Sequence, residues 1–149
     1  MTNLRLPIQV CVFLVRAQGN GWEYLLLRRV PRLGAFWQGV TGAPEVGETL
    51  IQGAAREVLE ETGLSPVKLD PVDFSYRFPV RDEWRAAYGP EPQEIVEHVF
   101  VGRVEGDEPT LSWEHDAWKW CGPDEAATLL KWRNNIEALW RCESFLATP

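Results

Sequence analysis

Glu57, Glu60 and Glu61 place three carboxylates within five residues, inside the stretch that runs from Gly42 to Leu64. On a helix of about 3.6 residues per turn these carboxylates lie together on one side, where like charges repel. Clustered hard oxygen ligands suit Mg²⁺ or Mn²⁺, which keep several waters for a phosphate substrate. A divalent cation would also remove the repulsion. The pattern therefore predicts a metal site that acts on phosphates.

The residues around the three glutamates support a site of this kind. Glycines flank the helix on both sides, at Gly42, Gly47 and Gly63. Together with Glu48 they form a turn that can bring backbone carbonyls and a further carboxylate close to the glutamates. The alternative is a solvated acidic face on which Arg56 and Glu60 make an ordinary i,i+4 ion pair.

The same stretch resembles the Nudix box, Gly-x5-Glu-x7-Arg-Glu-U-x-Glu-Glu-x-Gly-U, in which U is aliphatic. Its nine defined positions are filled without a departure by Gly42, Glu48, Arg56, Glu57, Val58, Glu60, Glu61, Gly63 and Leu64. The resemblance implies a Nudix α/β/α fold, with a mixed β-sheet sandwiched between helices. It also implies Mg²⁺-dependent hydrolysis of a nucleoside diphosphate linked to another group, with Mn²⁺ as a substitute metal.

The resemblance also implies roles for individual residues. The metal ligands would be the carboxylates of Glu57, Glu60 and Glu61. One of these carboxylates would hold or deprotonate the attacking water. Gly42 would offer its carbonyl oxygen to a metal, and Arg56 and Glu48 would orient the ligand carboxylates. Metal ions lower the pKa of water and neutralise charge on a diphosphate as its P–O bond breaks, which suits this reaction.

Three further stretches resemble one Nudix subgroup, the bacterial dihydroneopterin triphosphate pyrophosphohydrolases of folate synthesis. They are FWQGVTG at 36–42, EHDAWKW at 114–120 and LLKWRNNIEALW at 129–140. The subgroup resemblance implies cleavage between the α and β phosphates to give the monophosphate and pyrophosphate. It also implies that Glu114 is a fourth acid that reaches the metal site, the alternative being an exposed loop glutamate.

The substrate is expected to contact side chains outside the box. Trp37 and Gln38 precede the catalytic turn, and aromatic rings such as Trp84 and Tyr88 on the loop 81–94 suit stacking on a pterin or a purine. The full expected set is Arg28, Arg29, Trp37, Gln38, Trp84, Tyr88 and Asn134. Of the two histidines, His98 is expected to be structural because it lies in mid-strand, and His115 has no assigned role.

Other functions remain open. Two come from the same family: a dinucleoside tetraphosphate hydrolase, and a pyrophosphatase that clears damaged nucleoside triphosphates. A non-catalytic Nudix module that senses nucleotides is disfavoured, because such modules usually lose box carboxylates and every one is present here. Hydrolysis through a serine or cysteine nucleophile has no supporting motif, and neither a G-x-S-x-G elbow nor a P-loop occurs.

Hydrophobic patterning predicts the elements that position these residues. Strands are expected at 8–16, 23–30, 36–42, 74–80, 95–104 and 115–121, and helices at 49–63, 123–132 and 135–146. Thr49 is the expected N-cap of the first helix, Gly63 its expected end, and Gly19 to Gly21 a hairpin turn. The arc of that helix expected to face the core contains Ile51, Ala54, Ala55, Val58, Leu59 and Thr62. The mixture of strands and helices predicts an α/β sandwich.

Size and charge limit the remaining possibilities. A chain of 149 residues fits one domain, 1–149, with a sizeable core. Its net charge of −7 argues against nucleic acid as a partner, and 8–15 is too short an apolar stretch to span a membrane. Three widely spaced cysteines indicate reduced core thiols. We therefore expect a cytoplasmic monomer or homodimer whose partner is a small phosphorylated substrate.

Overall fold

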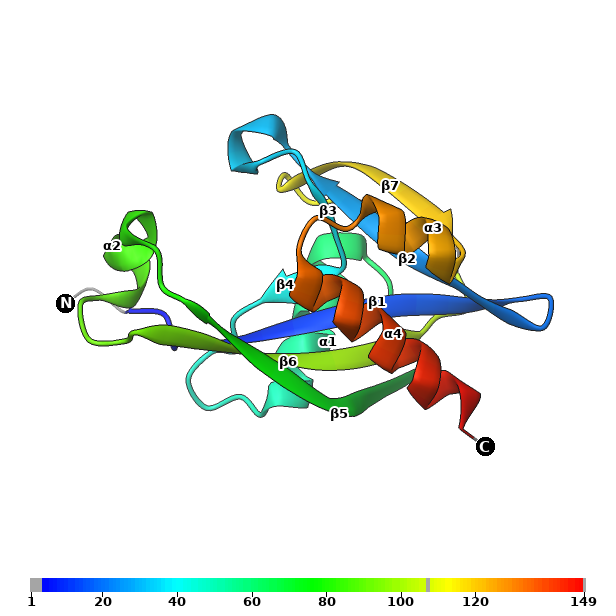
Figure 1. The fold of residues 1–149 in the computed structure, drawn as a ribbon, viewed down its shortest axis with the longest axis horizontal. Coiled ribbons are helices and arrows are strands. Elements are labelled where there is room, and N and C mark those ends of the chain that lie inside the picture. The colour runs from blue at the N-terminus through cyan, green and yellow to red at the C-terminus, as the bar shows by residue number, and fades with distance from the viewer. Residues whose placement is uncertain (1–3, 107, 149) are drawn as a thin grey trace.

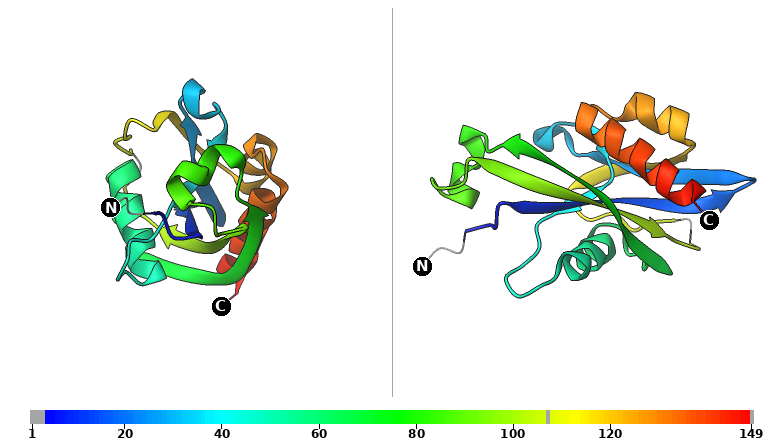
Figure 2. Two further views of the ribbon diagram at one scale, coloured as in Figure 1. Left: turned by 90° about the vertical axis from the view of Figure 1, so that its left-hand side faces the viewer. Right: turned by 60° about the horizontal axis from the view of Figure 1, so that its bottom comes forward.

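The computed structural model describes residues 4–106 and 108–148. Its helices lie on both faces of a twisted sheet, with α1 (Leu50–Thr62) on one side and α3 (Pro123–Leu129) and α4 (Arg133–Ala147) on the other (Figures 1 and 2). The expected α/β/α sandwich of mixed strands is confirmed.

Among the described residues the sheet contains seven strands. They are β1 (Ile8–Gln18), β2 (Gly21–Arg29), β3 (Trp37–Gln38), β4 (Val40–Gly42), β5 (Lys68–Pro79), β6 (Glu94–Arg103) and β7 (His115–Cys121). The order is β3-β2-β1-β6-β5, with β4 paired to β1 and β7 paired to β2. The β1–β6 pair is parallel and the other pairs are antiparallel. The expected hairpin is present, with Gln18 opposite Gly21.

Strand β1 supplies both halves of the core. Its even-numbered side chains from 10 to 14 pack with Ala54 and Val58 of α1, and its odd-numbered side chains from 11 to 15 pack with Ala138 and Leu139 of α4. Side chains of a strand alternate between faces, so a strand covered on both faces is apolar throughout. The sequence of this segment has that character. The three cysteines are buried and unpaired, as expected.

Several boundaries differ from the expected ones. The expected strand 36–42 is split at Gly39, where a Cβ atom would lie 2.8 Å from the carbonyl oxygen of Val12. Strand β5 begins at Lys68 rather than 74, because an irregularity between Pro71 and Ser75 lets it continue past a proline. The expected loop 81–94 contains the short turns η2 (Asp82–Trp84) and α2 (Arg85–Tyr88), and η1 (Pro31–Leu33) precedes β3.

Both expected ends of α1 are confirmed. The Thr49 hydroxyl accepts from the backbone N–H of Gln52 at 3.2 Å, and the Gln52 side chain accepts from the backbone N–H of Thr49 at 2.9 Å. This reciprocal capping box satisfies two free N–H groups at the start of the helix. Gly63 ends the helix in the left-handed region, at φ 71°, where a glycine carries no steric penalty.

The expected orientation of α1 is only partly right, because Ala54, Val58 and Thr62 of the expected arc are buried but its other three residues are not. Ile51, Ala55 and Leu59 are exposed, whereas Glu61 is only 2% exposed. The helix has two apolar stripes, and the one that begins at Leu50 packs on the sheet in place of the one that begins at Ile51. Periodicity alone does not choose between two apolar stripes. The buried stripe carries Glu61 inward, so the three glutamates do not share a solvent-facing patch.

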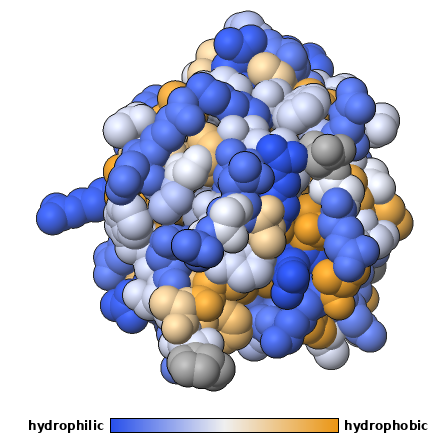
Figure 3. Space-filling view, turned by 90° about the vertical axis from the view of Figure 1, so that its right-hand side faces the viewer, coloured by the Kyte–Doolittle hydropathy of each residue, from blue (hydrophilic) through white to orange (hydrophobic). Residues whose placement is uncertain are grey.

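None of the helices within the described residues is long and apolar enough to cross a bilayer. The face that carries the tip of the β1–β2 hairpin is mostly hydrophilic, with small separate apolar patches (Figure 3).

Candidate active site

Arg56 is the centre of a hydrogen-bond network that joins the turn to α1. Its Nε and Nη2 atoms donate to both carboxylate oxygens of Glu48, at 2.8 and 3.0 Å, and Nη2 also donates to the Ala43 carbonyl at 3.0 Å. Its Nη1 atom donates to Glu57 at 3.0 Å and to Glu60 at 3.2 Å. Hydrogen bonds from Arg56 lower the pKa of Glu48 to about 2. Arg56 therefore holds the turn and two of the box glutamates in one arrangement.

The Glu57 carboxylate rests directly against the backbone of Gly42, at the end of β4. A Cβ atom at position 42 would lie 2.2 Å from the Glu57 Cδ atom and 2.5 Å from each of its oxygens. Burial raises the pKa of Glu57, although Arg56 opposes the shift. The glycine at this position thus leaves room for a carboxylate that no other residue would allow.

Glu61 follows Glu57 by one helical turn and is buried. Neither of its carboxylate oxygens has a hydrogen-bond partner among the described residues. Burial raises the pKa of Glu61 to about 10, with further contributions from Glu57 and Glu114, while Arg29 opposes the shift. Leaving a buried polar group unsatisfied costs about 1–3 kcal/mol. The protein groups around Glu61 therefore do not stabilise the negative charge of its carboxylate.

His115, at the start of β7, lies between Glu61 and Gln38. The Nε2 atoms of Gln38 and His115 are 3.0 Å apart, and the His115 Nδ1 atom is 3.9 Å from Glu61 Oε1. Burial, followed by the charge of Arg29, lowers the pKa of His115 to about 4. Gln38 therefore forms part of the wall of the site. Sequence reasoning left His115 without a role, although its position directly after Glu114 was a usable signal.

Arg29 and Glu114 border this group. The Arg29 Nη1 atom is 3.9 Å from Glu114 Oε2, and the Arg29 Nε atom is buried without a hydrogen-bond partner among the described residues. Arg28 points to the other face of the sheet, where it donates to Asp116 at 2.9 Å and lies 5.9 Å from the ring of Trp37. Of the two adjacent arginines, Arg29 is the one placed at the box.

The remaining expected substrate contacts lie farther from the box. Trp37 packs against the core beneath α3 and α4, and Asn134 is partly buried in the first turn of α4. Trp84 stands edge-on to Phe78 on the loop after β5. Tyr88 is 5% exposed, with Arg5 over its ring, so it is not available for stacking in this structure.

A buried polar cluster on the α4 side of the sheet was not expected. Gln9 and Tyr76 both donate to the Glu97 carboxylate, and Asn135 donates to the Tyr76 hydroxyl at 2.8 Å. Burial raises the pKa of Glu97 to about 7, while its hydrogen bonds oppose the shift. The signal was present in the sequence, because Glu97 lies on the same face of β6 as the core residues Ile95 and Val99.

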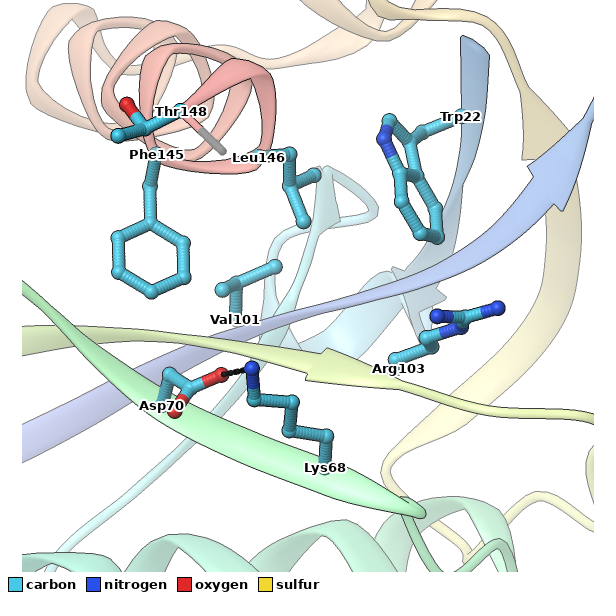
Figure 4. Close-up of a pocket in the computed structure, with 8 residues that line it drawn as sticks. All are labelled: Trp22, Lys68, Asp70, Val101, Arg103, Phe145, Leu146 and Thr148. Carbon is cyan, nitrogen blue, oxygen red and sulfur yellow. Dashed lines mark ion pairs between the residues drawn. The ribbon is translucent and has the colours of Figure 1, made fainter. Parts of the chain in front are cut away.

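A hollow on the α4 side of the sheet lies between the ends of β5, β6 and α4 (Figure 4). Trp22, Arg103 and Phe145 line it, and Lys68 pairs with Asp70 at 3.8 Å. Lys68 and Phe145 are exposed, and this hollow lies toward the opposite end of β6 from Glu97. It contains none of the box residues.

The donors near the box fit a hard divalent cation. Within 4–106 and 108–148, no three His, Cys, Asp or Glu side chains already enclose a point that could hold a metal ion. Glu60 is turned toward Arg56 and 56% of its side chain is exposed. Glu57 and Glu61, however, are neighbouring carboxylates, and both oxygens of Glu61 are unpartnered. Carboxylate oxygens without other partners are the ligands that Mg²⁺ prefers.

The box geometry agrees with a family match over most of the chain. Residues 5–140 match the NUDIX domain family. The chain belongs to the Nudix hydrolases. Enzymes similar to this Nudix hydrolase include diphosphatases that act on phosphorus anhydrides.

Relatives of this Nudix hydrolase differ in named activity. It is 34% identical over 137 residues to dihydroneopterin triphosphate diphosphatase of Escherichia coli, a match covering 89% of each chain. The solved E. coli dihydroneopterin triphosphate pyrophosphohydrolase has a TM-score of 0.78 at 29% identity and covers 97% of this chain and 99% of that one. The asymmetrical bis(5'-nucleosyl)-tetraphosphatase of Sus scrofa is 28% identical, covering 85% of this chain and 82% of that protein.

A further relative is much longer. The Myxococcus xanthus protein named octanoyltransferase is 35% identical over 133 residues, which are 89% of this chain and 35% of that protein. The Nudix hydrolase thus spans about a third of the length of this relative.

Proposed function

We propose that this Nudix hydrolase cleaves dihydroneopterin triphosphate between the α and β phosphates, giving the monophosphate and pyrophosphate. The observation that carries the proposal is the 34% identity to the E. coli diphosphatase of that substrate, which extends along 89% of both chains. A match of this extent includes the segments outside the box, where the organic part of the substrate is expected to bind.

Glu57, Glu61 and the Gly42 carbonyl would hold Mg²⁺, with Glu60 and Glu114 as further carboxylates near the box. When bound, the metal lowers the pKa of a water and neutralises charge on the diphosphate. Arg56 keeps Glu57 and Glu60 in place through the hydrogen bonds described above. Arg29, partly buried beside Glu61, would balance the negative charge of a phosphate.

The chain's own residues suffice for the proton transfer. A water oxygen forms a bond to phosphorus, the bond from phosphorus to the bridging oxygen breaks, and pyrophosphate leaves. One of the box carboxylates accepts the proton of the water, as a positioned general base. Because the attack is on phosphorus, reaction in H₂¹⁸O places the label in a phosphoryl product.

The Glu97 cluster supports a substrate with an amino-pyrimidinone ring. A pterin presents a 2-amino group and a ring N–H as donors beside a carbonyl acceptor. The Glu97 carboxylate accepts hydrogen bonds, and the Gln9 and Asn135 amides both donate and accept them. Gln9 directly precedes Val10, which pairs with Gly42, but the Gln9 side chain lies on the α4 face of the sheet, opposite to the face that α1 covers.

Aromatic rings near the start of α4 are available for stacking. Trp132 is 38% exposed, and its ring lies edge-on to Phe36, with ring centroids 6.2 Å apart. Lys131 and Arg81 approach the same indole, at 4.8 and 5.5 Å from its centroid. Cations over an indole face bring positive charge to the ring that would stack on the substrate.

A substrate panel tests the proposal. Purified protein with Mg²⁺ should hydrolyse dihydroneopterin triphosphate with a higher kcat/KM than nucleotide sugars, nucleoside triphosphates or diadenosine tetraphosphate, and an excess of EDTA should abolish the reaction. Full activity in EDTA after removal of carried-over metal would refute the metal requirement. If kcat/KM for diadenosine tetraphosphate is at least about tenfold higher than for the pterin, the protein is assigned as a dinucleoside tetraphosphatase instead. A tenfold ratio corresponds to about 1.4 kcal/mol of transition-state preference.

That second candidate, a dinucleoside tetraphosphatase, is favoured by the similarity to the S. scrofa enzyme. A comparison of GTP with ITP tests whether the Glu97 cluster binds the substrate ring, because these nucleotides differ only in the 2-amino group. If the cluster binds that group, GTP is preferred by the wild type and the preference disappears in Glu97→Gln. An equal preference in both proteins would remove the cluster from the substrate site.

A further inference from the structure

Two of the buried polar groups without partners beside the box, Glu61 and His115, face each other. Glu61 is 2% exposed and the His115 side chain is fully buried. The His115 Nδ1 atom and both Glu61 oxygens have no hydrogen-bond partner among the described residues, and Nδ1 is 3.9 Å from Glu61 Oε1. A water that bridged two such atoms through bonds of about 2.8 Å would need a separation of about 4.5 Å. The gap is therefore too narrow for a bridging water, and a shift of about 1 Å would close it to a direct bond.

Gln38 determines which nitrogen of His115 carries the proton. The Gln38 Nε2 atom, 3.0 Å from His115 Nε2, is an amide nitrogen that only donates. His115 Nε2 must then accept, so the proton of the neutral ring is on Nδ1. Nδ1 is the nitrogen that faces Glu61. Strand pairing fixes the position of Gln38 relative to His115, because these residues lie on β3 and β7, both of which are hydrogen-bonded to β2.

We propose that His115 is a positioning residue whose Nδ1–H donates to the Glu61 carboxylate and sets its orientation as a metal ligand, with Gln38 fixing the tautomer. The proposal rests on the proposed function in one respect, the assignment of Glu61 to the metal. The hydrogen bond from His115 would fix the position of one Glu61 oxygen and leave the other oxygen free for a cation. Partners of this kind behind metal ligands commonly change metal affinity by about 10–100-fold.

Two substitutions at position 115 form a matched pair. The side-chain amide of asparagine places its NH₂ group close to the position of Nδ1, whereas the longer glutamine side chain places its amide close to the position of Nε2. His115→Asn therefore keeps a donor toward Glu61, and His115→Gln does not. Both substitutions remove the ring and have similar polarity, so a purely structural role of His115 would make them equally disruptive.

The experiment combines NMR of the wild type with metal binding by the variants, and neither measurement needs a substrate. ¹⁵N chemical shifts of the His115 ring should show the Nδ1–H tautomer. Mn²⁺ titration followed by electron paramagnetic resonance should give His115→Asn an affinity within about threefold of wild type and His115→Gln a loss of about 10–100-fold. Thermal unfolding shows whether each variant is folded.

Three results would overturn the proposal. The first is an Nε2–H tautomer of His115 in the wild type, and the second is an equal loss of Mn²⁺ affinity in the two folded variants. The third is a Mn²⁺ affinity of Glu61→Gln equal to that of the wild type. Failure of the proposed function is a separate outcome. If no pterin or nucleotide of the panel is cleaved while the tautomer and the difference between the variants are observed, the substrate assignment fails and the role of His115 stands.

Discussion

Glu57 occupies space that any side chain at position 42 would need, since a Cβ atom there would lie 2.2 Å from the Glu57 Cδ atom. Gly42→Ala must therefore displace the carboxylate or open the contact between α1 and β4. We expect kcat/KM to fall by about 10²-fold, because a displacement of about 1 Å has this effect in active sites. Steady-state kinetics measure the fall, and Mn²⁺ titration should show weaker binding.

The control for this substitution is Gly21→Ala in the β1–β2 hairpin. A Cβ atom at Gly21 meets nothing within 4 Å. This variant should keep wild-type kinetics, and equal kinetic losses in the two variants would contradict the assigned role of Gly42.

Removing the charge of Glu57 or Glu61 should separate activity from stability. We expect Glu57→Gln and Glu61→Gln each to lower kcat by about 10²–10⁴-fold, as for loss of a ligand or general base. Without metal, the unfolding free energy of Glu61→Gln should be unchanged or higher, because a buried carboxylate without a partner is replaced by a neutral group. Denaturant unfolding in EDTA measures this. Wild-type kcat in both variants would refute the metal-site proposal.

The Arg56 network requires a guanidinium rather than a single charge. Arg56→Lys keeps the charge but has three N–H donors on one nitrogen in place of five on three nitrogens, so it cannot reproduce the bonds to Glu48, Ala43, Glu57 and Glu60. We expect Mn²⁺ affinity to fall by about 10–100-fold. Arg141→Lys is the control, since Arg141 makes an exposed i,i+4 pair with Glu137 at 3.4 Å. Unchanged Mn²⁺ affinity in Arg56→Lys would show that the network does not orient the ligands.

Glu97 should make stability depend on pH. Its pKa is raised from 4.5 to about 7 in the folded protein, so folding favours the protonated carboxyl. The contribution of Glu97 to the unfolding free energy is complete below the unfolded pKa and is lost as pH rises through about 7. The loss is about 2 kcal/mol between about pH 5.5 and about pH 8.5. Urea unfolding at both pH values should show this loss in wild type but not in Glu97→Gln. A loss of the same size in the variant would assign the pH dependence to other groups.

The sequence was sufficient for features whose determinants are local. The ends of α1 follow from Thr49 and Gly63, which act within a few residues of their own positions. The rotation of α1 was not predictable, because Ile51 and Leu59 make a second apolar stripe as convincing as the buried one. What fixes the rotation is tertiary: the packing on β1 and the bonds from Arg56 to Ala43 and Glu48.

The same distinction applies to the candidate site. The box residues are within 23 positions of one another, so their spacing identified them. Gln38, His115 and Glu97 acquire their partners only through strand pairing, and Gln38 was accordingly expected to contact the substrate. An acid or a histidine in a strand carries no local sign of what will lie opposite it. These roles therefore required the sheet register.

The parallel pairing of β1 with β6 has a consequence for the order in which the protein forms during synthesis. Gln9 and Glu97, which meet across this pair, are 88 residues apart. Parallel pairing across such a separation closes a long loop and is slow to form. On the ribosome, β1 and the box helix emerge well before β6, so the apolar β1 has no parallel neighbour until most of the chain has been made. A chain that stops before position 94 would retain every residue of the box, yet it would expose one edge of its central strand to pairing with other chains.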